Sequence, residues 1–392
     1  MSVRSDAWID VIFDFPVNSQ TVEIMNRNAT GLPLEAMLVG LLSGGGLLVA
    51  PRIIVNVTEL VVGVGRPGVL KLTALAAENV SIHYTGSIGS NFEVRHGLTN
   101  FIFEGCQVSP TATGLPRVGM FSAVIDGYTV IYKQVPSYRP VTQSLGKDVV
   151  VTAEAMANGN ISDWKKLNGI VEDSLMLLSL ADGTYIGSIY EDVYQNGHLV
   201  MTLLKAVKTM LYHKADYCID IKNLQACDLK TFLETSFPKY RELKVDFGLD
   251  IVIEYYLQAK AAEIIEVMYL AAVVGLERLA SFIQPYLSKR GKWKKWDSLL
   301  ARILRRSTDI TLRRKVKALL SHFGVPYSSK DLKFIVMRNS IVHTGQFPSK
   351  TNGSDAFDAL IGFFDRILLR ILGYQGKYYI NRLNSFQREI VP

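Results

Sequence analysis

The chain has 392 residues, of which 48% are hydrophobic and 20% are charged, and its formal net charge is +7. This length suits two or three domains. The composition excludes an intrinsically disordered chain, because the apolar surface is sufficient to offset the conformational entropy lost on folding. Three cysteines without a C-x-x-C pair, Cys106, Cys218 and Cys227, argue against a disulfide framework and favour a reducing compartment.

The N-terminal residues predict neither secretion nor a membrane span. Asp6, Asp10 and Asp14 interrupt the region where a secretory signal would place a basic and then an apolar segment. The longest uncharged stretch, 36–51, contains three consecutive glycines and is shorter than the roughly 20 apolar residues that cross a bilayer. We therefore expect a cytoplasmic protein that does not contact membranes.

Residues 3–141 consist of short apolar or alternating runs separated by Gly, Asn, Asp and Pro, a pattern typical of β-strands. Asp126-Gly127 stands between two such runs and predicts a hairpin with a tight turn. Many short strands favour a β-sandwich or barrel. We expect residues 1–245 to form a β-rich recognition or sensor unit, in which 145–160 is the candidate position of a subdivision.

The middle of the chain contains both a helical and a strand-like sequence pattern. Residues Asp163 to Leu180 have the periodicity of an amphipathic helix, and two strand-like runs follow that are joined at Asn196-Gly197. We assign this stretch to the N-terminal unit. The period changes to that of helices near Gly248, so we place the domain boundary between Pro238 and Gly248 and the second domain at 246–392.

This second domain is predicted to be all-α, with three helices that can be placed along the chain. The first covers about 261–287, where apolar residues recur three and four positions apart. The second begins near Ser328 and ends at Gly345, which can adopt the left-handed C-cap conformation. The third begins near Ser354 or Asp355 and ends at Gly373.

A strongly basic segment separates the first two of these helices. Between 286 and 320 there are twelve basic residues against Asp297 and Asp309, so this segment carries +10 and the rest of the chain is slightly acidic. Trp293 and Trp296 alternate with its lysines, a combination that suits single-stranded nucleic acid. A solvated helix face with buried tryptophans explains the pattern equally well. The candidate RNA-binding residues are Lys289, Arg290, Lys292, Lys294, Lys295, Arg302, Arg305 and Arg306.

The candidate catalytic residues lie near the end of the second helix. Asn339 and His343 are four positions apart and share a helix face, while Arg338 is one position round from Asn339. Polar groups placed beside a buried face cost free energy unless they are paired or have a function. The three side chains are therefore a candidate site.

The sequence MRNSIVHTG around these residues resembles the R-x4-H motif of the HEPN superfamily, with Arg338 and His343 as its ends. The preceding segment VVGLERLASF and the following FFDRILLRILGY are similar to the Apea-like branch, and the resemblance covers about 248–384. It implies a HEPN-like helical bundle that forms homodimers and cleaves RNA without a metal ion or other cofactor, often in anti-phage defence, abortive infection or as a toxin. It also implies that Glu277 holds Arg338 in place.

RNA cleavage by the substrate's own 2′-hydroxyl needs a base, an acid and positive charge on the phosphate. Arg338 would clamp the phosphate, His343 would transfer protons, and Asn339 would orient the substrate or the imidazole. Because one chain offers one motif histidine, we expect a composite site across a two-fold dimer axis. A phage-derived or other trigger on the N-terminal unit is a further expectation by family analogy.

Two other functions remain open. The helical domain could be a catalytically silent dimerisation module whose β-rich partner domain recognises a protein or glycan. In that case Arg338 and Glu277 would form a structural salt bridge, and His343 would cap the helix end. The helical domain could also be modified by a nucleotidyltransferase partner, as in some relatives.

Two weaker motifs favour structural roles. The G-x-G-x-x-G match at Gly63 to Gly68 precedes a strand-like run, which indicates a turn between strands and not a dinucleotide site. His213, Asp216, Cys218 and Cys227 do not have the spacing of a zinc motif, so packing is the preferred interpretation.

Overall fold

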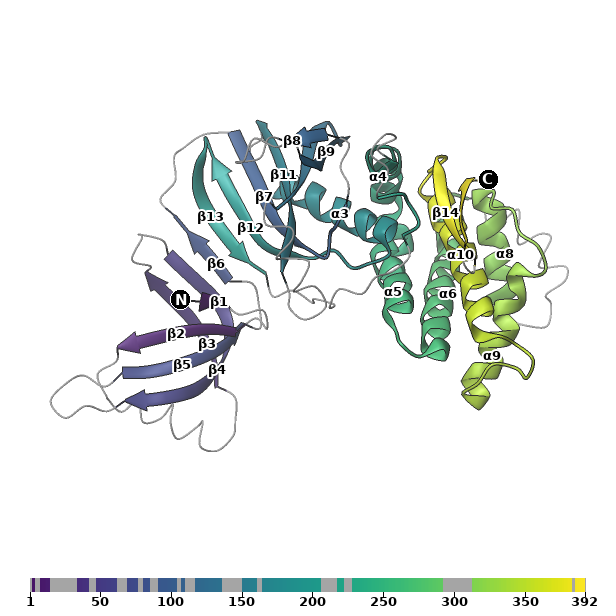
Figure 1. Cartoon of the computed structure of the whole chain (residues 1–392), viewed down its shortest axis with the longest axis horizontal. Helices are drawn as coiled ribbons and strands as arrows, with labels where there is room; N and C mark the ends of the chain where they lie inside the picture. Colours follow the sequence, from purple (N-terminus) through teal and green to yellow (C-terminus); the bar gives the residue numbers. More distant parts are fainter. Residues whose placement is uncertain are drawn as a thin grey trace. The chain divides into compact units, whose positions relative to one another are not determined.

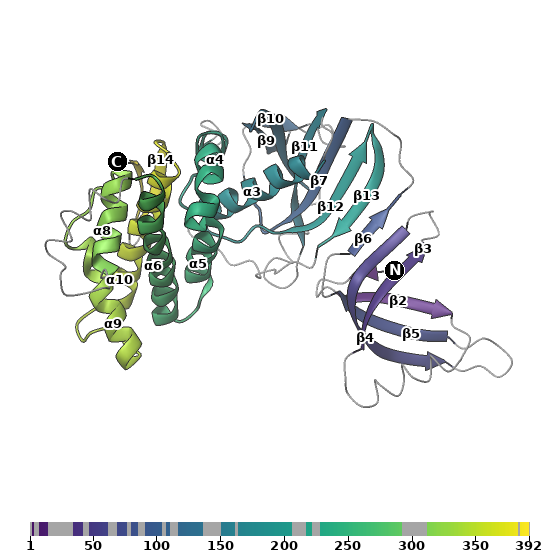
Figure 2. The same cartoon turned by 180° about the vertical axis from the view of Figure 1, so that it is seen from behind.

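The computed structural model describes residues 2–3, 8–14, 34–41, 47–61, 69–76, 80–84, 91–103, 107–109, 117–135, 150–160, 164–205, 217–221, 228–291, 312–382 and 385–391. An antiparallel sheet occupies the N-terminal half and helices the C-terminal half, as the sequence predicts at this coarse level (Figure 1, Figure 2). Contacts divide the chain into two compact units. Unit 1 comprises Met1–Ile102, Val130–Val171 and Gly187–Tyr212, and unit 2 comprises Phe103–Thr129, Glu172–Ile186 and His213–Pro392.

The strands of unit 1 pair antiparallel in the order β1-β2-β5-β4-β6-β13-β12-β7-β11-β10, with β3 beside β4. The described strands thus form one connected sheet path. Their bounds are β1 Ser2–Val3, β2 Trp8–Asp14, β3 Leu34–Leu41, β4 Leu47–Val61, β5 Val69–Ala76, β6 Val80–His83, β7 Asn91–Thr99, β10 Tyr128–Gln134, β11 Val151–Asn160, β12 Ser188–Gln195 and β13 His198–Leu204.

The two predicted hairpin turns are confirmed by the backbone. Asn196 and Gly197 join β12 to β13 with φ values of 50° and 81°. Asp126 and Gly127 follow β9 (Arg117–Ile125) and precede β10 with φ values of 50° and 81°. Positive φ at both central residues is what a tight two-residue hairpin requires, and Asn, Asp and Gly adopt it at the lowest cost.

The G-x-G-x-x-G segment lies outside the described residues, but the strands on either side of it are described. β4 and β5 pair antiparallel with Val61 opposite Val69. The described residues that follow the glycines therefore form a strand, as predicted, and not the helix that a dinucleotide site would need.

Strand β7 lies at the centre of the described sheet and carries buried residues. In β7, Val94, His96 and Leu98 are fully buried at every second position. His96 lies opposite Ala155 of β11 on one side and Glu191 of β12 on the other. The helix predicted at 163–180 is confirmed as α3, Trp164–Asp182, and it begins in unit 1 and ends in unit 2.

The helices of unit 2 pack around one central helix, α6. This helix contacts the helices before and after it in sequence, and the green to yellow part of Figure 1 shows them side by side. Their bounds are α4 Asp228–Phe247, α5 Leu249–Ala261, α6 Ile265–Lys289, α8 Leu312–Phe323, a 3-10 turn Asp331–Lys333, α9 Phe334–Thr344 and α10 Gly353–Ile371. The three helices that the sequence predicts correspond to α6, α9 and α10.

Helix α4 was not predicted. It runs through Pro238, where the sequence favoured a domain boundary, and it contacts α5 and α6 of the helical unit. It is amphipathic and buries Phe232, Leu233 and Phe237. The boundary predicted at 245/246 remains a prediction, while contacts group residues from 213 onward with the helices.

The expectation of an all-α C-terminal domain was wrong. After Gly373, which has a φ of 74°, strands β14 (Lys377–Arg382) and β15 (Ser385–Ile390) pair antiparallel. Strand β8 (Gln107–Ser109) pairs antiparallel with β9 at the end of the strand order that continues from β10, and contacts group both with unit 2 although they lie in the N-terminal half of the sequence. Tyr379 fixes the C-terminal hairpin, since its amide donates to the carbonyl of Cys218 at 2.8 Å and its hydroxyl to Asp220 at 3.0 Å. These long-range bonds explain why local pattern did not reveal the strands.

Buried polar side chains of α5 and α10 lie close to the buried thiol of Cys218. The hydroxyl of Tyr256 donates to Oδ1 of Asp365 at 2.6 Å, and the thiol of Cys218 donates to the carbonyl of Leu180 at 3.2 Å. Burial raises the pKa of Asp365 and also that of the Cys218 thiol. Cys218 is therefore a packed, unreactive thiol. Cys106 and Cys227, with His213 and Asp216, lie outside the described residues.

Across the described ranges, no group of three or more His, Cys, Asp and Glu side chains is arranged to hold a metal ion. None of the helices in those ranges is long and apolar enough to cross a membrane.

Candidate active site

The motif residues lie on α9, whose start is fixed by a local hydrogen-bond network. The backbone amide and the hydroxyl of Ser328 both donate to Oδ2 of Asp331, at 2.6 Å and 2.7 Å. Arg366 donates to the other carboxylate oxygen at 2.8 Å. Burial opposes ionisation of Asp331, but these bonds outweigh it and lower the pKa of this carboxyl. The predicted start near Ser328 is confirmed, with a 3-10 turn preceding the α-helix.

The end of α9 is also as predicted. Gly345 is left-handed, with a φ of 73°, and its amide donates to the carbonyl of Ile341 at 2.8 Å. The hydroxyl of Thr344 donates to the carbonyl of Ser340 at 2.8 Å. His343 thus lies in the last turn of a helix whose C-terminus is closed by backbone and hydroxyl groups.

Arg338 is held by two neighbours. Its Nε lies 3.0 Å from Oε1 of Glu277 on α6, and its Nη1 donates to Oδ1 of Asn339 at 3.1 Å. The side chains of Arg338 and Glu277 are 37% and 28% exposed, so the pair is reached by solvent. These two contacts fix the plane of the guanidinium and leave its Nη2 end available to a phosphate oxygen.

His343 and Asn339 are exposed on the outer side of α9. Within the described part of the chain, the imidazole of His343 makes no hydrogen bond to a helix-end carbonyl or to any other group. A helix turns about 100° per residue, so His343 lies about 40° from Asn339 and about 140° from Arg338. In one chain, Arg338 and His343 therefore stand at the two edges of one exposed arc, with Asn339 inside it.

The same arc carries exposed apolar side chains. Val336 and Val342 of α9 are 68% and 53% exposed. On α6, Val267 and Val274 are 49% and 40% exposed, and they lie two turns apart on the flank that also carries Glu277. Exposed valines therefore lie on both of the helices that carry the Arg338–Glu277 pair.

The predicted RNA-binding segment is only partly described. Lys289 pairs with Asp246 at 3.0 Å, and Arg290 lies 3.5 Å from Glu242 and 3.8 Å from the ring centroid of Tyr286. These two residues thus have local partners at the end of α6. The remaining candidates, Lys292, Lys294, Lys295, Arg302, Arg305 and Arg306, lie outside the described residues, as do Trp293 and Trp296.

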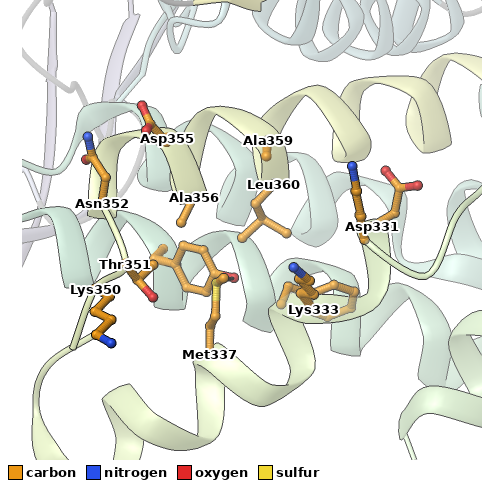
Figure 3. Close-up of a pocket in the computed structure, with 13 residues that line it drawn as sticks. Asp331, Lys333, Met337, Lys350, Thr351, Asn352, Asp355, Ala356, Ala359 and Leu360 are labelled. Carbon is orange, nitrogen blue, oxygen red and sulfur yellow. Dashed lines mark hydrogen bonds between the residues drawn. The ribbon is translucent and has the colours of Figure 1, made fainter. Parts of the chain in front are cut away.

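A cavity of about 400 Å³ beside α9 was not anticipated from the sequence (Figure 3). The side chains of Phe334 and Met337 line it from α9, and Lys330, Lys333 and Lys350 lie around it. The four-residue spacing of Lys333 and Met337, which places both on one flank of the predicted helix, was the feature of the sequence that could have indicated this cavity. Lys350 lies on a separate loop, and only the fold brings it to this place.

Family models, curated proteins and solved structures were each compared with the chain, and none of the three comparisons gives a match.

Proposed function

We propose that the helical unit is a HEPN-like bundle that cleaves RNA as a homodimer, through a metal-independent mechanism using Arg338 and His343. The observation that carries the proposal is the contrast between these two residues. Arg338 is oriented by Glu277 and Asn339, while the imidazole of His343 is exposed and makes no structural hydrogen bond in the described part of the chain. Resemblance to the R-x4-H motif assigns the chemistry.

The Arg338–Glu277 pair alone also suits a silent module, since a structural salt bridge is what that alternative requires. The surroundings of His343 distinguish the nuclease from the catalytically silent module. A capping histidine would donate to carbonyl groups at the helix end, where Gly345 and Thr344 already occupy the carbonyls of Ile341 and Ser340. A solvated imidazole without such bonds is free to accept or donate a proton to a substrate.

The chemical step is transesterification. A base removes the proton of the 2′-hydroxyl, the 2′-oxygen attacks the adjacent phosphorus, and the bond to the 5′-oxygen breaks as that oxygen takes up a proton. The products are a 2′,3′-cyclic phosphate and a free 5′-hydroxyl. His343 supplies the base or the acid, and the Nη2 end of Arg338 stabilises the charge on the phosphate.

Two imidazoles serve this step better than one, because base and acid act on opposite sides of the phosphorus. In one chain His343 lies about 140° round α9 from Arg338. A two-fold axis through this surface would place the partner copy's motif helix beside the first. The exposed Val336 and Val342 would be buried in such an isologous contact, together with Val267 and Val274 of α6.

Biologically, we infer a defence or toxin role in which the β-rich unit senses a trigger, by analogy with the family that the motif resembles.

The test is incubation of the purified full-length protein with total RNA in EDTA, comparing wild type with His343→Ala. His198→Ala is the matched control, because His198 is an exposed histidine of unit 1. Wild type and control are expected to produce fragments ending in 2′,3′-cyclic phosphate, and His343→Ala to produce none. Intact RNA with folded, dimeric wild type would reject constitutive cleavage, and cleavage by His343→Ala would reject the assigned site.

A further inference from the structure

The cavity beside α9 is formed by residues from four places in unit 2. The start of α9 and its 3-10 turn form one wall, the first turns of α10 form another, and a turn at 350–352 closes one end (Figure 3). Tyr269 contributes from α6. At about 400 Å³ the cavity lies near the lower end of the range of small-molecule sites, roughly 300–1,000 Å³, which suits a ligand the size of one nucleotide.

The middle of the cavity is apolar. Met337, Ala356 and Leu360 line it beside the ring of Tyr269. Tyr269 is held firmly, since its hydroxyl donates to the sulfur of Met337 at 3.4 Å and its ring packs edge-on against Phe347 at 5.1 Å. A fixed aromatic and thioether surface of this kind suits a planar ring, because such rings gain from contact with π faces and polarisable sulfur.

Each end of the cavity carries lysine side chains, with the carboxylate of Asp331 at one end and that of Asp355 at the other. Lys333 and Lys350 lie on either side of Met337 in Figure 3. Lys330 immediately precedes the 3-10 turn that contains Lys333. Within the described ranges, the ammonium groups of these three lysines make no ion pair or hydrogen bond. The carboxylate of Asp331 is already engaged by Arg366 and Ser328. The lysines therefore remain available to anionic groups at both ends.

Lys350 is held in an unusual conformation. Its φ is +81°, and the amide of Thr351 donates to the carbonyl of Pro348 at 3.0 Å, so Lys350 occupies the third position of a tight turn. Glycine is the residue that this position favours. A lysine there costs stability, and a strained residue that lines a cavity is a candidate for function. Next to it, the first turn of α10 adds the positive end of a 19-residue helix.

We propose that this cavity binds a nucleoside that carries phosphate on both its 3′ and 5′ oxygens, with the base on the apolar middle and one phosphate at each lysine end. An internal nucleotide of an RNA strand and a free nucleoside 3′,5′-bisphosphate share this chemistry. Asn352, Thr351 and Asp355 provide hydrogen-bonding groups for the base edge or the ribose.

This site is distinct from the proposed catalytic surface. Phe334 and Met337 face the cavity, whereas His343 is nine and six positions further along α9, or roughly 120° to 180° round the helix. Binding here does not depend on cleavage. Measurements with the His343→Ala protein therefore test this site even if the proposed nuclease activity is absent.

The experiment is calorimetric titration of the full-length His343→Ala protein with adenosine 3′,5′-bisphosphate, adenosine 5′-monophosphate, adenosine and a short 2′-O-methyl oligoribonucleotide. The added variants are Lys350→Gly and Lys333→Gln, one at each end, and Ala356→Leu, which fills the apolar middle. Lys377→Ala is the matched control, because Lys377 is exposed and lies beyond the far end of α10.

We expect the bisphosphate to bind more tightly than the monophosphate, and adenosine to bind least. Each lysine variant should weaken bisphosphate binding about tenfold, as expected for loss of one charge-assisted contact, while the control leaves it unchanged. Ala356→Leu should abolish binding. Lys350→Gly should also raise the melting temperature, because glycine relieves the positive φ, so its loss of affinity cannot arise from unfolding.

Binding by the oligonucleotide alone would identify the site as an RNA subsite, and binding by the free bisphosphate would identify a small-molecule site. Either result supports the proposal when the Lys350→Gly substitution weakens binding of that ligand. Equal binding of adenosine and the bisphosphate, binding insensitive to both lysine variants, or no binding of any probe to the folded protein would overturn it.

Discussion

Replacement of Arg338 by lysine separates the phosphate-binding role of this residue from its role in the fold. Lysine retains the positive charge and can keep a single contact with Glu277, but it lacks the planar fork that contacts Glu277 and Asn339 simultaneously. The Arg338–Glu277 pair is partly exposed, and such pairs contribute only about 0.2–1 kcal/mol because solvent screens them. The free energy of unfolding should therefore fall by less than about 1 kcal/mol.

The expected loss of activity is much larger. Removing one oriented donor from a developing phosphoryl charge typically lowers the rate about 10²–10³-fold, equivalent to about 2.7–4 kcal/mol of transition-state stabilisation. The assay is single-turnover cleavage of a labelled RNA in EDTA with protein in excess, together with urea unfolding of each variant. Arg278→Lys is the control, because Arg278 is the exposed neighbour of Glu277 and stacks on Phe282.

Three outcomes would refute this reasoning. A cleavage rate for Arg338→Lys within about tenfold of wild type, at unchanged stability, would show that Arg338 does not hold the phosphate. A loss of unfolding free energy well above 1 kcal/mol would show that the residue is mainly structural. A rate loss in the Arg278→Lys control equal to that of Arg338→Lys would show that replacing any arginine in this region lowers the rate, and that the effect is not specific to Arg338.

Two further predictions concern the two folded units. Gly275→Ala should lower the free energy of unfolding of unit 2 by about 1–3 kcal/mol, since a Cβ there would lie 3.0 Å from the ring of Phe364 and 3.1 Å from Cβ of Tyr255; an unchanged urea midpoint would contradict this close packing. In unit 1, burial, reinforced by the charge of Lys205, lowers the pKa of His96 well below 6.5. Below pH 6.5 the unfolded chain binds a proton that folded His96 does not, so stability should be constant above that pH and fall by up to about 1.4 kcal/mol per unit below it. Urea unfolding between pH 7.5 and 5.5 checks this, and an identical slope for His96→Asn would assign the proton to another group.

The sequence by itself determined the elements whose cause is local. Asn196-Gly197 specifies a tight turn because both residues tolerate positive φ, and the structure has 50° and 81° there. Gly345 ends α9 for the same reason, and the Ser328–Asp331 network begins it. Helical periodicity located α6 and α10, since their apolar stripes repeat every three or four residues.

Helix α4 and the C-terminal hairpin depended on packing that the local pattern does not record. Phe232 of α4 is buried edge-on against Tyr374, at 5.3 Å between ring centroids, and Tyr374 precedes β14 by three positions. Each element is stabilised by a partner far away in sequence. In the sequence, Pro238 favoured a domain boundary at this position. The helix nevertheless continues through Pro238, with Phe237 and Tyr240 buried on either side of it.

For the candidate site, the sequence determined which chemistry-bearing residues share one helix, and only the tertiary structure decided what surrounds them. The contact between Arg338 and Glu277 joins residues on two helices, and periodicity cannot reveal whether two such side chains meet. The cavity is a stronger case, because the loop lysine Lys350 approaches Met337 only through the packing of α6, α9 and α10. Local chain geometry fixes turns and helix ends, whereas burial of side chains from distant segments fixes which polar groups remain exposed beside one another.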